Sequence, residues 1–321
     1  MSATLISVIM PVYNSEKYVG EAIESIINQE FTDFEFIIVD DGSTDNSLQI
    51  ILSYDDPRIH LITHKTNMGN YSARNEAMHL AQGKYICVMD SDDISMPDRL
   101  LTQFNFMEYY PDYIALGSLV NLLYTNHSTS RRINIFDEDE CKVYLLQDNV
   151  FIHPSLIFRK ETLLKHNLFY NEKYYYAADF DLVVQLSKLG NIGNIPSFLL
   201  NYRVHPDQIS CIKYKEQQIY ADMIRLSQIS QFNLSPTQCE CVLHLNLMAQ
   251  RPLMVNEIVL AEKWTDKLLK QNEIFSLYNH QQLYYFLKEK LLANYRNNLI
   301  LTQNVHWNST GLIGIISNGH H

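Results

Sequence analysis

The sequence predicts an α/β protein with a mostly parallel β-sheet flanked by helices, followed by a C-terminal helical extension. Short apolar runs alternate four times with amphipathic stretches in the first third of the chain. This alternation is typical of a doubly wound parallel sheet. Polar residues, most of them carboxylates, directly follow three of the apolar runs. Because ligands in such sheets bind beyond the carboxyl ends of the strands, we expect one crevice to collect these polar groups.

The composition excludes several classes of protein. The 321 residues suffice for one large α/β domain and an appendage, and 46% hydrophobic with 19% charged residues is ordinary for a globular chain. The net charge of −11 argues against nonspecific nucleic-acid binding, which needs a basic surface. The five cysteines form no Cys-x-x-Cys pair, so neither a zinc site nor a disulfide framework is indicated.

The sequence also indicates where the protein works. The first ten residues lack the basic and long apolar segments of a signal peptide, and no apolar run approaches the roughly 18 residues of a membrane span. We therefore expect a cytoplasmic protein. Peripheral contact with the inner face of the membrane, through the C-terminal helices, remains open at this point.

The first strand is predicted over Leu5–Met10, and we expect Pro11 to stop it because proline cannot donate a hydrogen bond to a sheet. After the loop Pro11-Val12-Tyr13-Asn14, a helix should begin with Asn14 or Ser15 as its cap. The apolar residues of this helix recur four apart, as Tyr18, Val19, Ala22, Ile23, Ile26 and Ile27.

Three more strand–helix units follow in the predicted order. Apolar runs predict strands over Phe34–Val39, Arg58–Ile62 and Tyr85–Met89. The helix after the second strand should end near Leu52. The next helix is predicted over Asn70–Ala81, with Gly83 as the stop. A further helix should start within Ser95-Met96-Pro97-Asp98, with Ser95 as the cap.

The stretch Asp90-Ser91-Asp92-Asp93 directly follows the fourth strand. Adjacent carboxylates repel one another, so a positive group is needed to stabilise them at a buried strand end. Mg²⁺ is typically held by one or two carboxylates together with substrate phosphates. A solvated acidic turn is the alternative interpretation.

Two common phosphate-binding motifs are absent from the sequence. No Gly-x-Gly-x-x-Gly follows the first strand, which argues against a dinucleotide cofactor, and no Gly-x4-Gly-Lys-Ser/Thr marks a P-loop. A bound diphosphate would therefore depend on a metal ion and on basic side chains.

The second half is less regular. Predicted elements are a strand over Tyr113–Leu119, a hairpin or loop over Tyr124–Asp139, a helix over Glu138–Leu146, a loop at His153 leading into a strand, and a helix that begins at Asp179. His153 either lines an acceptor site or is a turn residue. Asp179 is either a helix cap or a functional carboxylate.

Helices are predicted from Tyr214 to about Arg296, with breaks at Ser235-Pro236 and Arg251-Pro252. One of them carries an apolar stripe, formed by Leu283, Phe286, Leu287 and Leu291 with Lys290 beside it. Such a stripe is either core or a surface for a membrane or a partner.

Four segments resemble family 2 glycosyltransferases of the GT-A fold. They are Val8-Ile9-Met10-Pro11-Val12-Tyr13-Asn14, Ile38-Val39-Asp40-Asp41-Gly42-Ser43-Thr44-Asp45, Ala73-Arg74-Asn75 and Asp90-Ser91-Asp92-Asp93. These segments span the first hundred or so residues in the order and spacing of that family. The resemblance implies transfer of a sugar from a nucleotide donor, usually a UDP-sugar, with a divalent metal (Mn²⁺ or Mg²⁺).

The resemblance also implies roles for residues of the first two segments. Tyr13, flanked by Pro11 and Asn14 in the donor-binding segment, is similar to the residue that packs on the nucleobase; its alternative is a plain loop aromatic. Asp41 is similar to the carboxylate that accepts a hydrogen bond from uracil N3–H. Asp40 is expected only to cap the next helix.

The Asp-x-Asp segment is implied to hold the diphosphate end of the donor. Asp92 resembles the metal ligand, Asp90 lies toward the ribose or the metal, and Ser91 between them belongs to the same donor site. Asp93 is expected only to close the turn. Arg74 would offset diphosphate charge, with a surface arginine as its alternative.

Two later stretches resemble further family motifs. Asp179 matches the Asp of a Glu-Asp pair that serves as general base, although Ala178 stands where Glu is usual. Leu199–Ser210 resembles Tyr-Arg-x-His-x-x-Gln-x-Ser, in which Arg203 would pair with phosphate and His205 would ligate metal or touch the diphosphate. A structural role is the alternative for His205.

The sequence thus predicts an inverting glycosyltransferase that acts on a glycan or glycolipid acceptor. It resembles bacterial lipooligosaccharide and capsule β-1,3-N-acetylglucosaminyl- or galactosyltransferases. We expect a catalytic domain over residues 1–212, with a nucleotide-sugar half (1–118) and an acceptor half (119–212), and a helical region over 213–321. A catalytically silent sugar-nucleotide binder and a nucleotidyltransferase remain as alternatives, and the oligomeric state is open.

Overall fold

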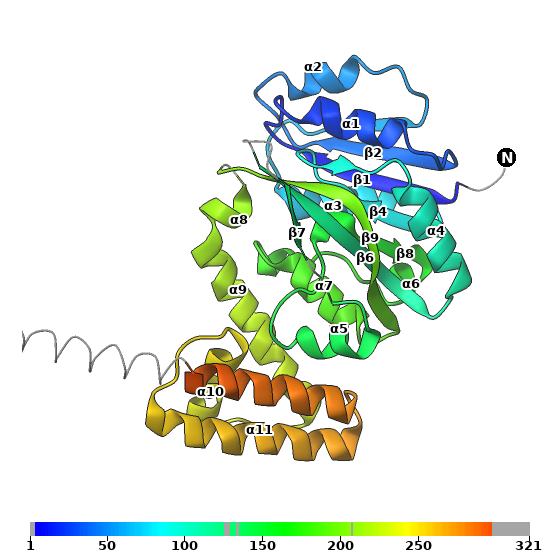
Figure 1. The fold of residues 1–321 in the computed structure, drawn as a ribbon. Coiled ribbons are helices and arrows are strands. Elements are labelled where there is room, and N and C mark those ends of the chain that lie inside the picture. The colour runs from blue at the N-terminus through cyan, green and yellow to red at the C-terminus, as the bar shows by residue number, and fades with distance from the viewer. Residues whose placement is uncertain (1–3, 125–128, 133–134, 207, 297–321) are drawn as a thin grey trace, which may run out of the picture. The chain divides into compact units, whose positions relative to one another are not determined.

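The computed structural model describes residues 4–296, apart from 125–128, 133–134 and 207 (Figure 1). The chain divides into two compact units. The first contains Met1–Leu145 and Asn149–Ala221, and the second contains Leu146–Asp148 and Asp222–His321. The division of the catalytic domain at residue 118 and the start of the helical region after residue 212, both expected from the sequence, stay predictions.

One mixed sheet forms the centre of the first unit (Figure 1). Its parallel half runs in the order β3 (Ile59–Thr63), β2 (Phe34–Asp40), β1 (Ile6–Val12) and β4 (Tyr85–Val88). The order continues through β8 (Ile157–Arg159), β6 (Tyr113–Tyr124), β9 (Asn191–Val204) and β5 (Ile94–Ser95), while β7 (Thr129–Arg132) pairs with β6. The predicted α/β class is confirmed.

Helices cover both faces of this sheet because the central strands are apolar on both sides. Alternate residues of β1, such as Ile6, Val8 and Met10, share one buried cluster with α1 (Val19–Ile27), α2 (Ser47–Leu52) and α4 (Arg99–Tyr109). Helix α3 (Asn70–Leu80) packs on β1 and β2 through residues outside that cluster, and α7 (Ala178–Leu186) packs on β6.

Strand β1 does not stop at Pro11, contrary to the sequence prediction. Pro11 lies inside the strand, paired in register with Val39 of β2. The carbonyl of Ile9 accepts from Met89 N, so Ile9 and every second residue after it direct their backbone groups toward β4. Pairing with β4 ends at Ile9, and the missing N–H of Pro11 therefore faces no strand.

Two predicted helix caps are also wrong because their side chains bond elsewhere. Helix α1 begins at Val19, and neither Asn14 nor Ser15 caps it with a side chain. Ser95 belongs to β5, where its Oγ accepts from Gln29 Nε2 at 3.2 Å, and α4 begins only at Arg99. In both cases a tertiary hydrogen bond takes the place of the local cap.

Helix α3 ends just before Gly83, the stop expected from the sequence, but Gly83 itself is not its cap. The helix ends at Leu80 with Ala81 as its cap, and Gly83 has no positive φ. Instead, a Cβ at Gly83 would lie 2.5 Å from the backbone nitrogen of Ser7. Glycine is needed here because two backbones approach closely.

The second half of the first unit completes the sheet and its flanking helices. Strand β7 runs antiparallel to β6, so the predicted hairpin is confirmed for the described residues. The remaining elements are α5 (Glu138–Tyr144), η1 (His153–Ser155), α6 (Lys160–Lys165), η2 (Glu172–Tyr174) and α8 (Ile209–Ile212). Helix α9 (Tyr214–Ser227) spans the division between the two units.

The second unit is helical in its described part. It contains η3 (Gln228–Phe232), α10 (Gln238–Met248), α11 (Val255–Phe275) and helical backbone over 280–296. Both predicted breaks separate helices. Leu283, Leu287 and Leu291 are buried, so the apolar stripe is core rather than a membrane or partner surface. Among the described residues, no helix is both long and apolar enough to cross a bilayer.

We predict that Gly83→Ala destabilises the fold by about 1–3 kcal/mol, because the new Cβ overlaps the β1 backbone at Ser7. Urea unfolding of both proteins measures this loss. The control is Gly20→Ala in α1, where the Cβ would lie 3.4 Å from Tyr54 Oη and alanine favours the helix. Equal stability of the Gly83 variant and the wild type would contradict the proposed backbone approach.

Candidate active site

Three carboxylates gather immediately after β4. One oxygen from each of Asp90, Asp92 and Asp93 lies within 4.8 Å of the others. Asp93 is completely buried; its Oδ1 accepts from Arg203 N at 2.8 Å, and its Oδ2 has no hydrogen-bond partner. Burial, together with Asp92 and Asp90, raises the pKa of Asp93 well above its ordinary value. Asp93 thus anchors β9 as well as the turn, and the cluster is not a solvated acidic turn.

Arg74 supplies a cation to this cluster from α3. Its side chain is only 2% exposed and forms an ion pair with Asp90, so the alternative of a surface arginine is wrong. Burial raises the pKa of Asp90, and Arg74 works against that rise. The buried Nε of Arg74 has no hydrogen-bond partner.

The end of β9 brings a second set of basic groups to the cluster. His205 Nε2 lies 3.0 Å from Asp92 Oδ2, and its buried Nδ1 has no hydrogen-bond partner. Arg203 donates from Nε to the Asp92 carbonyl at 2.8 Å and from Nη2 to Glu21 at 2.7 Å. The ring of Tyr18 packs against both residues, 4.7 Å from the Arg203 guanidinium carbon and 5.0 Å from the His205 ring.

These residues fit a hard divalent cation. Carboxylate oxygens are the ligands that Mg²⁺ prefers, and manganese accepts the same oxygens together with an imidazole nitrogen. The unpartnered Asp93 Oδ2 and the raised pKa of Asp93 both indicate that positive charge is in deficit at this strand end. Asp92, Asp90 and His205 are the candidates for holding such an ion.

Asp179 occupies the first turn of α7, but Ala177 precedes the helix and no side chain caps it. Asp179 Oδ1 accepts from Tyr71 Oη at 2.9 Å, and its Oδ2 accepts from Asn149 Nδ2 at 3.0 Å. Burial raises its pKa, although both hydrogen bonds oppose the rise. Asp179 is therefore a carboxylate oriented by two neutral donors, and it is not a helix cap.

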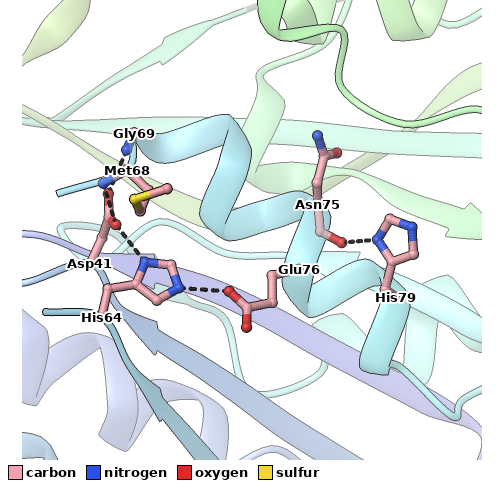
Figure 2. A network of polar contacts seen from close by, with 7 residues as sticks. All are labelled: Asp41, His64, Met68, Gly69, Asn75, Glu76 and His79. Atoms are coloured by element: carbon pink, nitrogen blue, oxygen red, sulfur yellow. Dashed lines mark hydrogen bonds and ion pairs between the residues drawn. The ribbon is translucent and has the colours of Figure 1, made fainter. Parts of the chain in front are cut away.

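Asp41 follows β2 and is almost fully buried. Figure 2 shows its contacts. Its Oδ1 accepts from Met68 N and its Oδ2 accepts from Gly69 N, both at 2.8 Å. Asp40 ends β2 and does not cap α2, since that helix begins at Ser47 with Asn46 before it. Tyr13, in the loop after β1, is 48% exposed.

The remaining predicted residues connect the strand-end loops. Asn14 Oδ1 accepts from Thr44 N at 2.8 Å, which joins the loop after β1 to the loop after β2. Ser91 donates to Ser15 Oγ at 2.9 Å, which joins the acidic turn to the loop after β1. Pro11 is half-buried inside β1. The three polar segments therefore meet at one end of the sheet.

Several residues in contact with the site were missed by the sequence analysis. Tyr71 could have been found, because it lies three residues before Arg74 and thus on the same face of a helix. Asn149 and His64 lie outside every recognised motif and gave no signal. His153 belongs to the turn η1, where its Nε2 lies 2.8 Å from Tyr170 Oη and burial lowers its pKa well below the ordinary value.

The parallel sheet with an acidic cluster beyond β4, a base candidate on α7 and a long mixed extension of the sheet defines a GT-A glycosyltransferase. The family model described as glycosyl transferase family 2 matches residues 7–168. An uncharacterized glycosyltransferase of Methanocaldococcus jannaschii is 35% identical over 228 residues, which cover 69% of this chain and 78% of that protein. The chain belongs to glycosyl transferase family 2.

Two further comparisons agree with this assignment. An Escherichia coli protein named UDP-Glc:alpha-D-GlcNAc-diphosphoundecaprenol beta-1,3-glucosyltransferase is 28% identical, over 70% of this chain and 87% of its own length. The crystal structure of S. aureus TarS with UDP-GlcNAc superposes with a TM-score of 0.61 over 92% of each chain, at 19% identity. The structural likeness supports the fold.

We predict that Arg74→Met destabilises the protein by about 1–3 kcal/mol at neutral pH, because Asp90 loses its cation while remaining partly buried. The loss should shrink as the pH falls, since Asp90 can then take up a proton. Urea unfolding at several pH values measures both effects.

The matched control for Arg74→Met is Lys84→Met, which breaks the exposed ion pair with Glu108 and should cost less than about 1 kcal/mol. Equal losses in the two variants, or a loss from Arg74→Met that does not depend on pH, would contradict this account of the acidic cluster.

Proposed function

We propose that this chain is an inverting, metal-dependent glycosyltransferase, which moves a sugar from a UDP-sugar to a hydroxyl group of a glycan or glycolipid acceptor. One observation carries the proposal. Helix α3 contacts both reacting ends of such a site, through the Tyr71 bond to Asp179 and the Arg74 ion pair with Asp90. A carboxylate base activates the attacking hydroxyl, and positive charge at the acidic cluster stabilises the departing diphosphate, so both groups assist a direct displacement on a nucleotide sugar.

Asp179 is proposed as the general base. It would take the proton from the acceptor hydroxyl while the hydroxyl oxygen attacks the anomeric carbon on the side opposite the diphosphate. Tyr71 and Asn149 hold the carboxylate in one orientation, and burial raises its pKa toward the range in which a base is effective. A single displacement of this kind inverts the anomeric configuration.

The nucleotide is proposed to lie along the ends of β1, β2 and β4. Tyr13 would stack on the nucleobase, and Asp41 would accept from its ring N–H. Asp92 and Asp90, with His205, would hold Mn²⁺ or Mg²⁺, which when bound stabilises the negative charge of the departing diphosphate. Arg74 and Arg203 add positive charge on either side of the acidic cluster.

The class of substrate is inferred from a relative. The Escherichia coli protein named above carries UDP-Glc and a lipid diphosphate acceptor in its name. We therefore propose a role in building a surface polysaccharide or lipooligosaccharide, with the reaction taking place in the cytoplasm or peripherally at the inner face of the membrane. The donor sugar is a hexose or N-acetylhexosamine in this proposal.

The departure from the Glu-Asp motif does not favour a silent sugar-nucleotide binder. Ala178 is fully buried at the start of α7, whereas the neighbouring Asp179 keeps two oriented donors. A nucleotidyltransferase would need a glycine-rich triphosphate loop after β1, and Pro11-Val12-Tyr13-Asn14 provides none. A silent binder or a nucleotidyltransferase would transfer no sugar. Neither alternative therefore predicts a loss of sugar transfer when Asp179 is replaced.

We predict that Asp179→Asn lowers kcat by about 10²- to 10⁴-fold, the usual contribution of a general base, while UDP binding is retained. UDP release from a panel of UDP-sugars with a pool of glycan acceptors measures kcat, and calorimetry measures binding.

Wild-type activity should fall as the pH drops through the raised pKa of Asp179, because only the ionised carboxylate accepts a proton.

The control is Asp181→Asn, a buried carboxylate in the same helical turn whose Oδ1 accepts from Gln185. It should keep kcat within about threefold of the wild type, as expected away from reacting groups. Full transfer activity in Asp179→Asn would rule out this residue as the base.

We also predict that Mn²⁺ or Mg²⁺ stabilises the wild type by about 1–3 kcal/mol at saturation, since an ion that binds only the folded state shifts the unfolding equilibrium. Thermal unfolding with metal or with chelator measures the shift. Asp92→Asn should abolish it, and Asp55→Asn, an exposed carboxylate outside the cluster, should retain it. An undiminished shift in Asp92→Asn would place the ion elsewhere.

A further inference from the structure

A histidine outside the recognised motifs joins two carboxylates behind the proposed nucleobase site (Figure 2). His64 directly follows β3, and its Nδ1 lies 2.7 Å from Asp41 Oδ1. Its Nε2 lies 2.6 Å from Glu76 Oε2 on α3. The His64 backbone N–H also donates to the Asp40 carbonyl at 2.9 Å. The ring is therefore held between the end of β2 and one face of α3.

The proton count of this arrangement assigns a charge to His64. Each short nitrogen–oxygen contact requires a hydrogen between the two atoms, and an ionised carboxylate can only accept. Both ring nitrogens therefore donate, which makes the ring an imidazolium. Burial opposes the charged ring, but the hydrogen bonds to Asp41 and Glu76 prevail and raise the pKa of His64.

The hydrogen bonds that Asp41 accepts from His64, Met68 and Gly69 leave one acceptor position on its carboxylate unused. Oδ1 receives His64 Nδ1 and Met68 N, whereas Oδ2 receives only Gly69 N. A carboxylate oxygen has two acceptor positions, so Oδ2 can take one more donor. Because both ring nitrogens of His64 donate, the Asp41 carboxylate serves as the acceptor in each of its contacts with His64, Met68 and Gly69.

We propose that His64 and Glu76 form a positioning pair that fixes Asp41 as an oriented, acceptor-only carboxylate, and thereby selects a nucleobase with a ring N–H over one with a ring nitrogen acceptor. Uracil presents such an N–H at N3, and cytosine presents an acceptor there. This inference rests on the proposed function, because it assumes that Asp41 contacts the base. His64 acts through Asp41 and does not touch the substrate.

The surroundings of His64 make the pair sensitive to charge. The charged groups that face the ring are Asp41 from the end of β2 and Glu76 from α3, and the neighbouring Lys65 is exposed. As the pH rises through the raised pKa of His64, the ring loses its charge and one of its two donated hydrogen bonds. Selection of the nucleobase should weaken over that pH range.

Calorimetric titration of the full chain with UDP and with CDP, each with Mg²⁺, tests the pair. The wild type should bind UDP more tightly than CDP. His64→Ala should weaken UDP binding about 10- to 100-fold, the usual effect of losing a hydrogen bond to a charged group, and change CDP binding much less. Glu76→Gln, a near-isosteric change at a half-exposed side chain, should weaken UDP binding more at pH 8 than at pH 6.

The matched control is His79→Gln. His79 lies on the same helix as Glu76, but its Nδ1 contacts the Asn75 carbonyl (Figure 2). Its ring stacks on Phe169. This variant should bind both nucleotides as the wild type does. In steady-state assays, His64→Ala should raise KM for the donor with little change in kcat, and thermal unfolding verifies that each variant is folded.

The outcomes separate the two proposals. A wild type that binds neither UDP nor a UDP-sugar would overturn the proposed function itself. A wild type that prefers UDP, with an unchanged preference in folded His64→Ala, would overturn only the positioning role. Equal weakening of UDP and CDP in His64→Ala would also overturn it, because the residue would then support the loop without selecting the base.

Discussion

The mutual repulsion of Asp90, Asp92 and Asp93 is the constraint on which the rest of the site depends. A buried strand delivers all three carboxylates to one turn, where water cannot fully solvate them. Basic residues contact the acidic turn from two directions. Arg74 comes from α3, and Arg203 and His205 come from the end of β9. Because these residues are far apart in sequence, the acidic turn holds the two halves of the sheet's active edge together.

The parts of the fold that the sequence predicted are those fixed by local pattern. Apolar runs of strand length and helical spacing of apolar residues located the β-strands around Asp41 and Asp90 and the helix that carries Arg74. Local pattern failed where a side chain forms a hydrogen bond with a residue distant in the sequence instead of capping the nearby helix. Ser95 was expected to cap a helix, yet it pairs in β5 and accepts from Gln29, a partner 66 residues away.

The same distinction applies to the candidate site. Asp179 was predicted because its position near a helix start resembles a known motif, but its donor Asn149 comes from an irregular segment with no motif or periodicity. The contact between His64 and Asp41 depends on parallel pairing of β2 with β3, which places the residues that follow both strands side by side. Such neighbours follow from strand order, and the sequence alone did not establish that order.

Helix α3 fixes the spacing of three separate parts of the site. Tyr71, Arg74 and Glu76 contact Asp179, Asp90 and His64, respectively. These five residue steps span about 7.5 Å along a helix axis, and inserting one residue would turn everything beyond it by about 100°. A single insertion or deletion between Tyr71 and Glu76 would therefore change the relative directions of the contacts with Asp179, Asp90 and His64. We expect insertions and deletions among natural variants to fall in the loops on either side of α3. The helix itself should vary by substitution.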